Sequence, residues 1–198
     1  MLFLYPLLQG NAEIATLLNS LNAVISSSIA IRTKSSLWEN YSLYSTSLYF
    51  IFDLILLVWR SELIPEDFFH HIGALIGIFY SSTQYPEYIN QNLVCLFFCE
   101  ISGLILPFFR VAMKGGDELY IPEFLNQEII GSCFLLVFFV ARFLILPRWL
   151  IKQEKRYLKS ILLPATIITV LSMIWLFRML PPATNYLIEI AGEMIKGN

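Results

Sequence analysis

The sequence predicts an all-α membrane protein, a multi-pass transmembrane helical bundle of five to six spans. Hydrophobic residues make up 57% of the 198 residues and charged residues only 14%, whereas a soluble domain carries about a quarter charged residues. Apolar runs recur along the chain, and several approach the roughly 20 residues that a bilayer-crossing helix needs. No alternation of apolar and polar residues predicts strands. A helical bundle is therefore the expected fold.

In chain order, the expected spans cover residues 14–31, 41–59, 68–85, 88–109, 129–147 and 160–179. The first contains several serines and asparagines, so the bundle has five or six crossings depending on whether this segment spans. Pro181 and Pro182 are expected to stop the last helix, because proline lacks the backbone N–H that a helix interior uses. Residues 1–13 are then a short N-terminal segment, 14–180 the bundle, and 181–198 a tail that could form an interfacial helix.

The distribution of Lys and Arg favours one orientation in the membrane. If all six segments cross, one side holds seven basic residues (Arg32, Lys34, Arg148, Lys152, Lys155, Arg156, Lys159) and the other five (Arg60, Arg110, Lys114, Arg178, Lys196). By the positive-inside rule the first side faces the cytosol or matrix. No basic residue precedes Arg32, so we expect neither a signal peptide nor an Arg-rich transit peptide.

The two histidines of the chain, His70 and His71, are adjacent and lie near the start of the third span. Pro65 and the acidic residues after it are typical of a helix N-terminus, which places His70 about 8 Å along the helix. An imidazole at that depth needs a polar partner. His71 points about 100° away from His70, so the pair does not form one forked ligand. Gly73 and Gly77 share a face with His70, so a helix or an acyl chain can approach closely there.

Two acidic residues lie inside other spans. By helix rise, Asp53 lies about 10 Å inside Arg60, and Glu100 about 15 Å inside Arg110. These helix ends are on the same side of the membrane as Pro65, so both carboxyl groups and the histidines are expected to converge in one half of the bilayer. Such groups are costly to leave unpaired in lipid, so we expect at least one histidine to bond with Asp53 or Glu100. Arg142 lies near the opposite end of its span, from which its side chain can snorkel to the basic loop.

Other site classes have less support in the sequence. Cys95, Cys99 and Cys133 lie in apolar runs without metal spacing, so they are interpreted as small buried hydrophobic residues. Two histidines are too few for a membrane di-iron centre, and no metal site or other cofactor is expected. A net charge of −2 and the lack of a basic patch with interleaved aromatic residues give no reason to expect a nucleic-acid partner.

The order of these motifs resembles the TLC-domain family, which includes ceramide synthases and translocon-associated proteins. The resemblance covers about residues 17–150 and rests on 49–55 (YFIFDLI), His70-His71, Glu100-Ile101-Ser102 with Pro107, and 138–142 (FFVAR) with Pro147. It implies an endomembrane protein with a lipid-related role. Ceramide synthases have a pair of aspartates downstream of their histidines, and the region after His71 has only Glu87 and Glu100. The chain is thus more similar to the small members of the family.

Three functions remain open at this stage. A lipid-binding protein would hold a lipid or acyl chain in a polar-lined pocket, with Gly73, Gly77 and Ser102 as candidate binding residues. An acyl-transfer enzyme would use His70 or His71 as general base, with Glu100 or Asp53 as the orienting carboxylate. An accessory subunit of a larger membrane protein complex, for instance in the mitochondrial inner membrane, would keep these residues for helix packing. We favour lipid binding without catalysis, with membrane lipids and other membrane proteins as partners.

Overall fold

A computed structural model of the chain describes residues 11–61, 64–84, 86–114 and 127–196. Within these ranges the chain is helical and forms no strand, which confirms the predicted all-α class. The elements are α2 (Ala12–Thr33), α3 (Ser36–Trp59), α4 (Pro65–Gln84), η1 (Pro86–Tyr88), α5 (Ile89–Glu100), η2 (Ile101–Leu104), α6 (Leu106–Lys114), α7 (Gln127–Phe139), the π-helix η3 (Val140–Ile145), α8 (Leu146–Leu150) and α9 (Lys155–Lys196).

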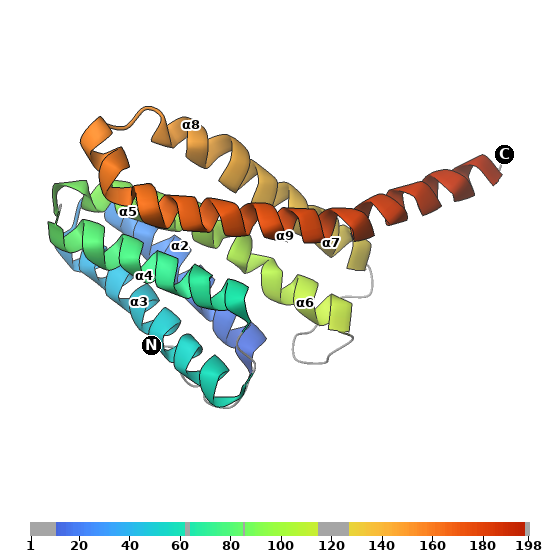
Figure 1. The fold of residues 1–198 in the computed structure, drawn as a ribbon, viewed down its shortest axis with the longest axis horizontal. Helices are drawn as coiled ribbons and strands as arrows, with labels where there is room; N and C mark the ends of the chain where they lie inside the picture. Colours follow the sequence, from blue (N-terminus) through green and yellow to red (C-terminus); the bar gives the residue numbers. More distant parts are fainter. Residues whose placement is uncertain (1–10, 62–63, 85, 115–126, 197–198) are drawn as a thin grey trace.

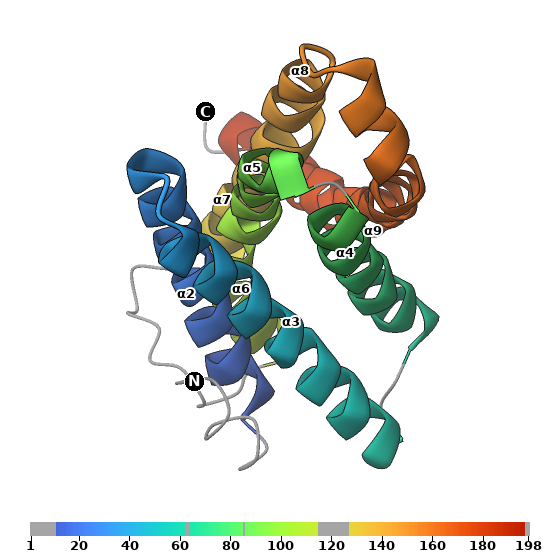
Figure 2. The ribbon, with the colours of Figure 1, turned by 90° about the vertical axis from the view of Figure 1, so that its left-hand side faces the viewer.

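The helices run up and down along one axis, and the segment α5–η2–α6 lies in the middle. Figure 2 shows α2 and α3 on one side of this segment and α4 and α9 on the other, with α8 at the top edge of the view. Contacts of α5 or η2 with α2, α3, α4, α7 and η3 support that central position. The connections α2–α3 and α8–α9 lie at the same end of the bundle (Figure 1). One face of the central segment, with Leu93, Glu100 and Ser102, is therefore buried in the interior.

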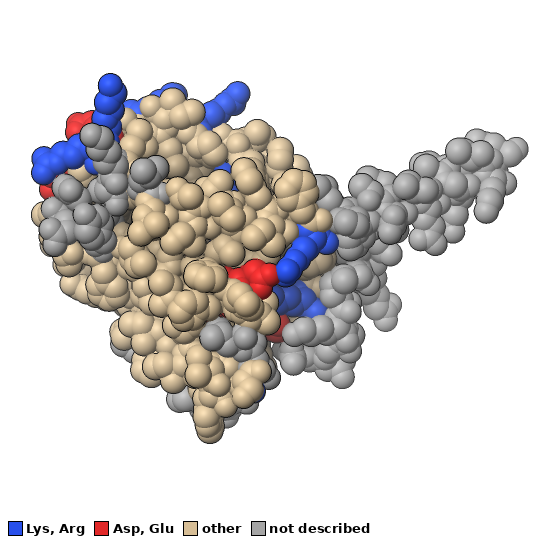
Figure 3. Space-filling model, viewed as in Figure 1, with Lys and Arg blue, Asp and Glu red and all other residues tan. Residues whose placement is uncertain are grey.

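Four helical stretches of the described chain have the length and composition to cross a bilayer: Ala12–Thr33, Ser36–Trp59, Pro86–Val111 and Ile129–Leu150. The histidine helix α4 is not among them, and the apolar part of α9, Leu163–Arg178, is shorter. Both nevertheless pack along each other within the bundle. Apart from a few charged groups, uncharged side chains cover the face of the bundle shown in Figure 3. The protein is thus an integral membrane protein.

The serine-rich helix α2 belongs fully to the bundle. Ser20, Ser26 and Ser27 are almost completely buried, and the Ser27 hydroxyl donates to the carbonyl of Ala23 at 2.6 Å. The hydroxyl of a serine in a membrane helix can thus donate its hydrogen bond to a backbone carbonyl of the same helix, and the small side chain lets a neighbouring helix approach closely. Most of the polar residues that weakened the prediction for this segment are therefore buried in the bundle, whereas Ser28 is exposed.

Helix α9 does not end at Pro181, where the sequence predicted a stop, and continues to Lys196. Figure 1 shows α9 changing direction where it leaves the bundle. A proline inside a helix removes one hydrogen bond and bends the axis, and it terminates the helix only when no favourable continuation exists. The tail that the sequence placed apart at residues 181–198 is helical and continuous with α9 as far as Lys196.

Candidate functional site

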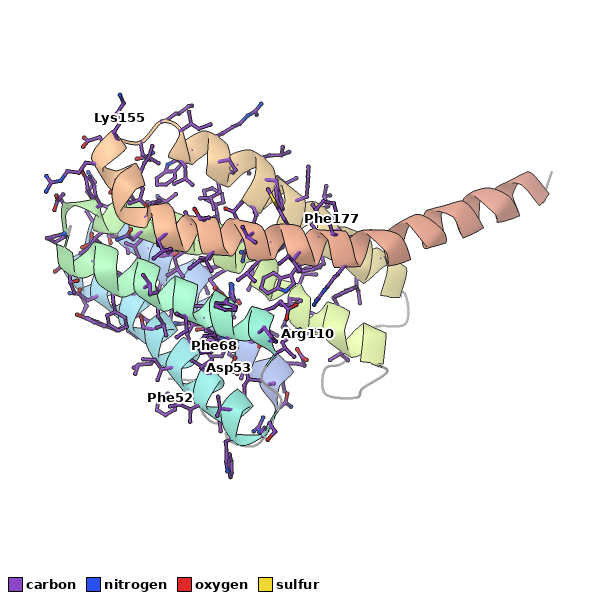
Figure 4. All side chains as sticks on the ribbon, in the orientation of Figure 1. Phe52, Asp53, Phe68, Arg110, Lys155 and Phe177 are labelled. Carbon is purple, nitrogen blue, oxygen red and sulfur yellow. The ribbon has the colours of Figure 1, made fainter. Side chains whose placement is uncertain are left out.

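A cavity of about 320 Å³ lies among α2, α3, α4, α5, η2, α6, α7, η3 and α9 and is lined by many polar residues. We call it the polar cavity. Its carboxyl groups are Asp53, Asp67 and Glu100, its guanidinium groups are Arg110, Arg142 and Arg178, and both histidines line it as well. The predicted convergence of Asp53, His70, His71 and Glu100 is therefore observed. Figure 4 shows Asp53 and Arg110 toward one end of the bundle, whereas Lys155 lies at the other end.

His71 and Asp53 form the closest pair of titratable groups in this cavity. The His71 Nε2 atom lies 3.0 Å from Asp53 Oδ2, with the two side chains 8% and 15% exposed. The Nδ1 atom lies 2.6 Å from the backbone carbonyl oxygen of Asp67. Because a carbonyl only accepts, Nδ1 carries a proton, and the Nε2–Oδ2 contact needs a second proton on one of its two atoms. The pair is therefore neutral as a whole, and the predicted bond between a histidine and Asp53 or Glu100 is confirmed.

His70 has a different environment. Its ring lies 5.1 Å from the ring of Trp175 and 5.9 Å from that of Phe50, centroid to centroid. The buried Nδ1 atom has no hydrogen-bond partner in the described part of the chain. The rings of His70 and His71 stand at 82° to each other, so they do not act as one forked ligand, as expected. His70 keeps one polar atom available in the cavity.

Glu100 is held by α2 and not by a histidine. The Ser20 hydroxyl donates to Glu100 Oε2 at 2.9 Å, and both residues are buried. A β-carbon at position 103 would overlap the Ser20 hydroxyl and lie 3.5 Å from Glu100 Oε2. Gly103 therefore leaves the room in which this bond forms. The sequence identified Glu100 but not its partner.

Arg142 was expected to snorkel outward, and this prediction is wrong. Its terminal nitrogens donate to the Cys99 carbonyl oxygen at 2.7 Å and to the Ser172 hydroxyl at 3.3 Å. Its guanidinium lies 5.3 Å from the centroid of the Phe138 ring, within the range of a cation–π contact. Arg142 therefore crosses the interior of the bundle and lines the polar cavity.

Arg142, which the sequence placed only by its position near the end of a span, lies in the π-helix η3. The Leu146 N–H bonds to the Ala141 carbonyl, five residues back. Pro147 follows directly and has no N–H to offer to the previous turn. A wider turn changes the direction of every side chain within it, and single π-turns are frequent at functional sites. Here it directs Arg142 toward α5 and α9.

The three residues proposed as lipid-binding lie in two places. Ser102 lines the polar cavity, and its hydroxyl is 3.4 Å from the Cys99 carbonyl. Gly73 and Gly77 face α9, where added β-carbons would lie 3.0 Å from Ile167 and 3.3 Å from Pro164. The glycines therefore permit close packing of α4 on α9. They also line a second cavity of about 120 Å³, which we call the apolar cavity.

Two ion pairs lie beside the polar cavity at the end where α2, α4 and α6 meet. Arg178 Nη2 of α9 lies 2.6 Å from Glu66 Oε1 of α4, and Arg110 Nη1 of α6 lies 3.7 Å from Glu13 Oε2 of α2. Arg178 is 63% exposed and Arg110 40%, and Figure 3 shows acidic and basic side chains side by side on this face. These groups mark the polar end of the cavity.

The sequence reasoning missed Asn19, which is 1% exposed and lines the polar cavity. Its Oδ1 atom has no hydrogen-bond partner among the described residues. An asparagine within an apolar run is costly in lipid, and that signal was available in the sequence. In the described ranges, no three His, Cys, Asp or Glu side chains gather as metal ligands.

Residues 14–181 match the sequence profile of the TLC domain. The chain belongs to the TLC-domain family. The match covers every element that lines the two cavities and includes α2, the segment whose role as a span was uncertain. Neither a curated protein nor a solved structure matches the chain. Membership in the TLC-domain family associates this membrane protein with lipid metabolism or sensing.

Proposed function

We propose that this TLC-domain protein binds a membrane lipid, with the polar end of the lipid in the polar cavity. One observation carries the proposal. Three buried polar atoms of residues lining that cavity have no partner in the described chain: Asn19 Oδ1, His70 Nδ1 and Arg142 Nε. A buried polar atom without a hydrogen bond costs about 1–3 kcal/mol. A bound polar group in the cavity would remove this cost.

The chemistry of these atoms restricts the ligand. The Arg142 Nε–H can only donate, so it needs an acceptor oxygen, whereas Asn19 Oδ1 can only accept and needs an O–H or N–H donor. A polar end with a hydroxyl and a carbonyl group meets both demands. The cavity volume of about 320 Å³ is at the lower end of the range typical for small-molecule sites. Water is the alternative occupant, and only the experiment below distinguishes it from lipid.

The charges beside the cavity favour an uncharged polar end. Asp53 is neutralised by His71, and the ion pairs Glu66–Arg178 and Glu13–Arg110 balance one another. Glu100 and Arg142, which both line the cavity, also oppose each other in sign. Asp67, the remaining carboxyl group of the cavity, disfavours an anionic ligand, and a cationic ligand would lose its hydration for this one counter-charge.

The test compares lipid retained by the full chain purified in a mild detergent. Arg142→Gln removes the charged donor, and Arg148→Gln, at an exposed position on α8, is the matched control. Because a hydrogen bond to a charged group contributes about 1.5–3 kcal/mol, we expect Arg142→Gln to lose about tenfold or more of the retained lipid, measured by mass spectrometry of extracts. Arg148→Gln should retain the wild-type amount. Equal lipid in all three proteins, or no lipid in any, would contradict the proposal.

Acyl transfer is a second candidate function, favoured by the 3.0 Å contact between His71 and Asp53, since a carboxylate that orients an imidazole is typical of general-base sites. However, both ring nitrogens of His71 are bonded, and His70 is the histidine with an available atom. We therefore favour binding over catalysis. The paired variant His70→Asn with His71→Asn tests this, with the cellular acyl-lipid profile and membrane assembly as readouts. A changed profile with intact assembly would support an enzyme.

The same paired variant tests the accessory-subunit function. Loss of a larger membrane complex with an unchanged lipid profile would support a structural subunit that contacts other membrane proteins. For the compartment, we propose the endomembrane system, on the grounds of family membership, and the mitochondrial inner membrane is the alternative. Localisation of the tagged full chain in cells decides between the two.

A further inference from the structure

The apolar cavity adjoins the polar cavity inside the bundle. Phe50, His70, Cys99 and Glu100 line both cavities, and no charged side chain other than Glu100 lines the apolar one. The apolar cavity extends from these shared residues between α4, α5 and α9. A polar cavity beside an apolar one offers adjoining places for the two ends of an amphiphile.

The far end of the apolar cavity is filled by aromatic packing. Tyr157 is fully buried and packs with Tyr88 and Ile161, and Trp149 and Leu150 complete the cluster. The Tyr157 hydroxyl lies 3.2 Å from Cys95 Sγ, and burial raises the pKa of this hydroxyl above its ordinary value. From Glu100 to Asn92, both of which line the cavity, α5 rises about 12 Å. The apolar cavity is thus bounded in length.

The volume of about 120 Å³ limits what this chamber holds. A dry cavity of about 150 Å³ holds one benzene molecule, so the apolar cavity has room for about five methylene groups. A short length of one hydrocarbon chain therefore fits, and two chains side by side do not.

We propose that the ligand of this protein is a single-chain lipid with an uncharged hydroxyl-bearing polar end, such as a monoacylglycerol, part of whose chain occupies the apolar cavity. This inference rests on the proposed function, since it assumes that the polar cavity holds the polar end. A diacyl lipid is disfavoured because its second chain finds no room in the apolar cavity and would have to lie outside it. The acyl chain of a lipid in the bilayer is already surrounded by hydrocarbon, so its transfer to the apolar cavity adds little affinity. The cavity contributes selectivity instead, because it leaves no room for a second acyl chain.

The first test locates the chain directly. The full chain in detergent is incubated with a monoacylglycerol that carries a photoactivatable diazirine at the end of its acyl chain, irradiated and mapped by peptide mass spectrometry. We expect labels near Cys95, Ile161 and Tyr157, and excess monooleoylglycerol should remove them. Labels confined to lipid-facing positions such as Leu163 and Phe177, which are 61% and 70% exposed, would overturn the inference.

The second test blocks the apolar cavity. Ala165 lines it from α9, and Ala165→Phe should fill the chamber, while Val170→Phe, at a 49% exposed position of the same helix, is the matched control. In an equimolar mixture, we expect wild type and Val170→Phe to prefer monooleoylglycerol over dioleoylphosphatidylcholine by about tenfold or more, and Ala165→Phe to lose that preference. Cys95→Phe gives the same test from α5 if Ala165→Phe does not fold.

The outcomes separate the two proposals. If wild type binds both lipids equally, or if filling the cavity leaves the preference unchanged, the single-chain inference fails while lipid binding stands. If wild type retains no lipid of either kind, the proposed function fails as well. A preference that disappears in Ala165→Phe and persists in Val170→Phe supports the single-chain inference.

Discussion

Replacing Asp53 by asparagine should be far less harmful than removing either partner of the His71 pair. In Asp53→Asn, neutral His71 still donates from Nδ1 to the Asp67 carbonyl, while its Nε2 accepts from the new amide. Both contacts of the wild-type ring, at 2.6 Å and 3.0 Å, can then persist with one proton fewer. We expect a cost of about 1 kcal/mol or less in unfolding free energy, because no buried polar atom loses its partner.

In the two alanine variants, by contrast, a buried polar atom loses its hydrogen-bond partner. Asp53→Ala leaves His71 Nε2 without its hydrogen-bond partner and should cost about 1–3 kcal/mol. His71→Ala leaves the Asp53 carboxyl group unpaired in the bundle, and breaking a buried pair in this way costs about 3–5 kcal/mol. It also removes an imidazole ring whose centroid lies 5.0 Å from that of the Phe50 ring. The predicted order of destabilisation is therefore His71→Ala, then Asp53→Ala, then Asp53→Asn.

Titration of the purified full chain with sodium dodecyl sulfate in mixed micelles measures these differences, with far-UV circular dichroism as the signal. Glu87→Gln is the control, because its side chain is 48% exposed and 3.7 Å from Arg156, where an ion pair contributes little. If Asp53→Asn is as unstable as His71→Ala, the charge on Asp53 stabilises the fold by itself, and the neutral-pair reasoning is wrong.

Three further predictions concern the contacts around the cavities. Gly103→Ala should displace the Ser20 hydroxyl and lower the free energy of unfolding by about 1–3 kcal/mol. The same substitution should cost less when Ser20 is already alanine. If a double-mutant cycle finds that the two effects simply add, the contact between these residues is contradicted. Gly73→Leu should push α4 from α9, where the added β-carbon meets a side chain at 3.0 Å, and lower the thermal midpoint of the purified protein; an unchanged midpoint would refute close packing. Glu66→Gln should change the free energy of unfolding by no more than about 1 kcal/mol, because Arg178 is 63% exposed. A larger loss in the same detergent titration would mean that the ion pair is shielded from water.

Much of the fold and part of the site followed from the sequence, for physical reasons that particular residues illustrate. The bilayer fixes the length of each apolar run, so the ends of the spans were predicted to within a few residues, except for α9, which continues to Lys196. The rise of a helix fixes depth, so Asp53, the histidines and Glu100 were placed together correctly. Depth does not fix direction around the helix axis, and for that reason Ser20 was not identified as the partner of Glu100.

Local geometry and context account for the predictions that failed. Arg142 was placed by its depth near the end of a span, but it lies in a π-turn and its side chain points into the bundle. The serines of α2 were counted against a membrane span, although buried serines at a helix interface are favourable. Pro181 was interpreted as a stop, but it lies within α9. Each failure concerns a property that depends on neighbouring helices or hydrogen bonds rather than on composition.

The π-helix at Val140–Ile145 implies that this segment holds one residue more than a regular helix of the same length requires. Such an insertion weakens the local hydrogen bonding and is retained where function outweighs stability. Deleting one residue between Arg142 and Pro147 would restore regular winding and rotate Arg142 by about 100° relative to α8. The shortened protein would then have a more regular helix but no guanidinium in the interior. Its stability should therefore rise while its ligand binding falls.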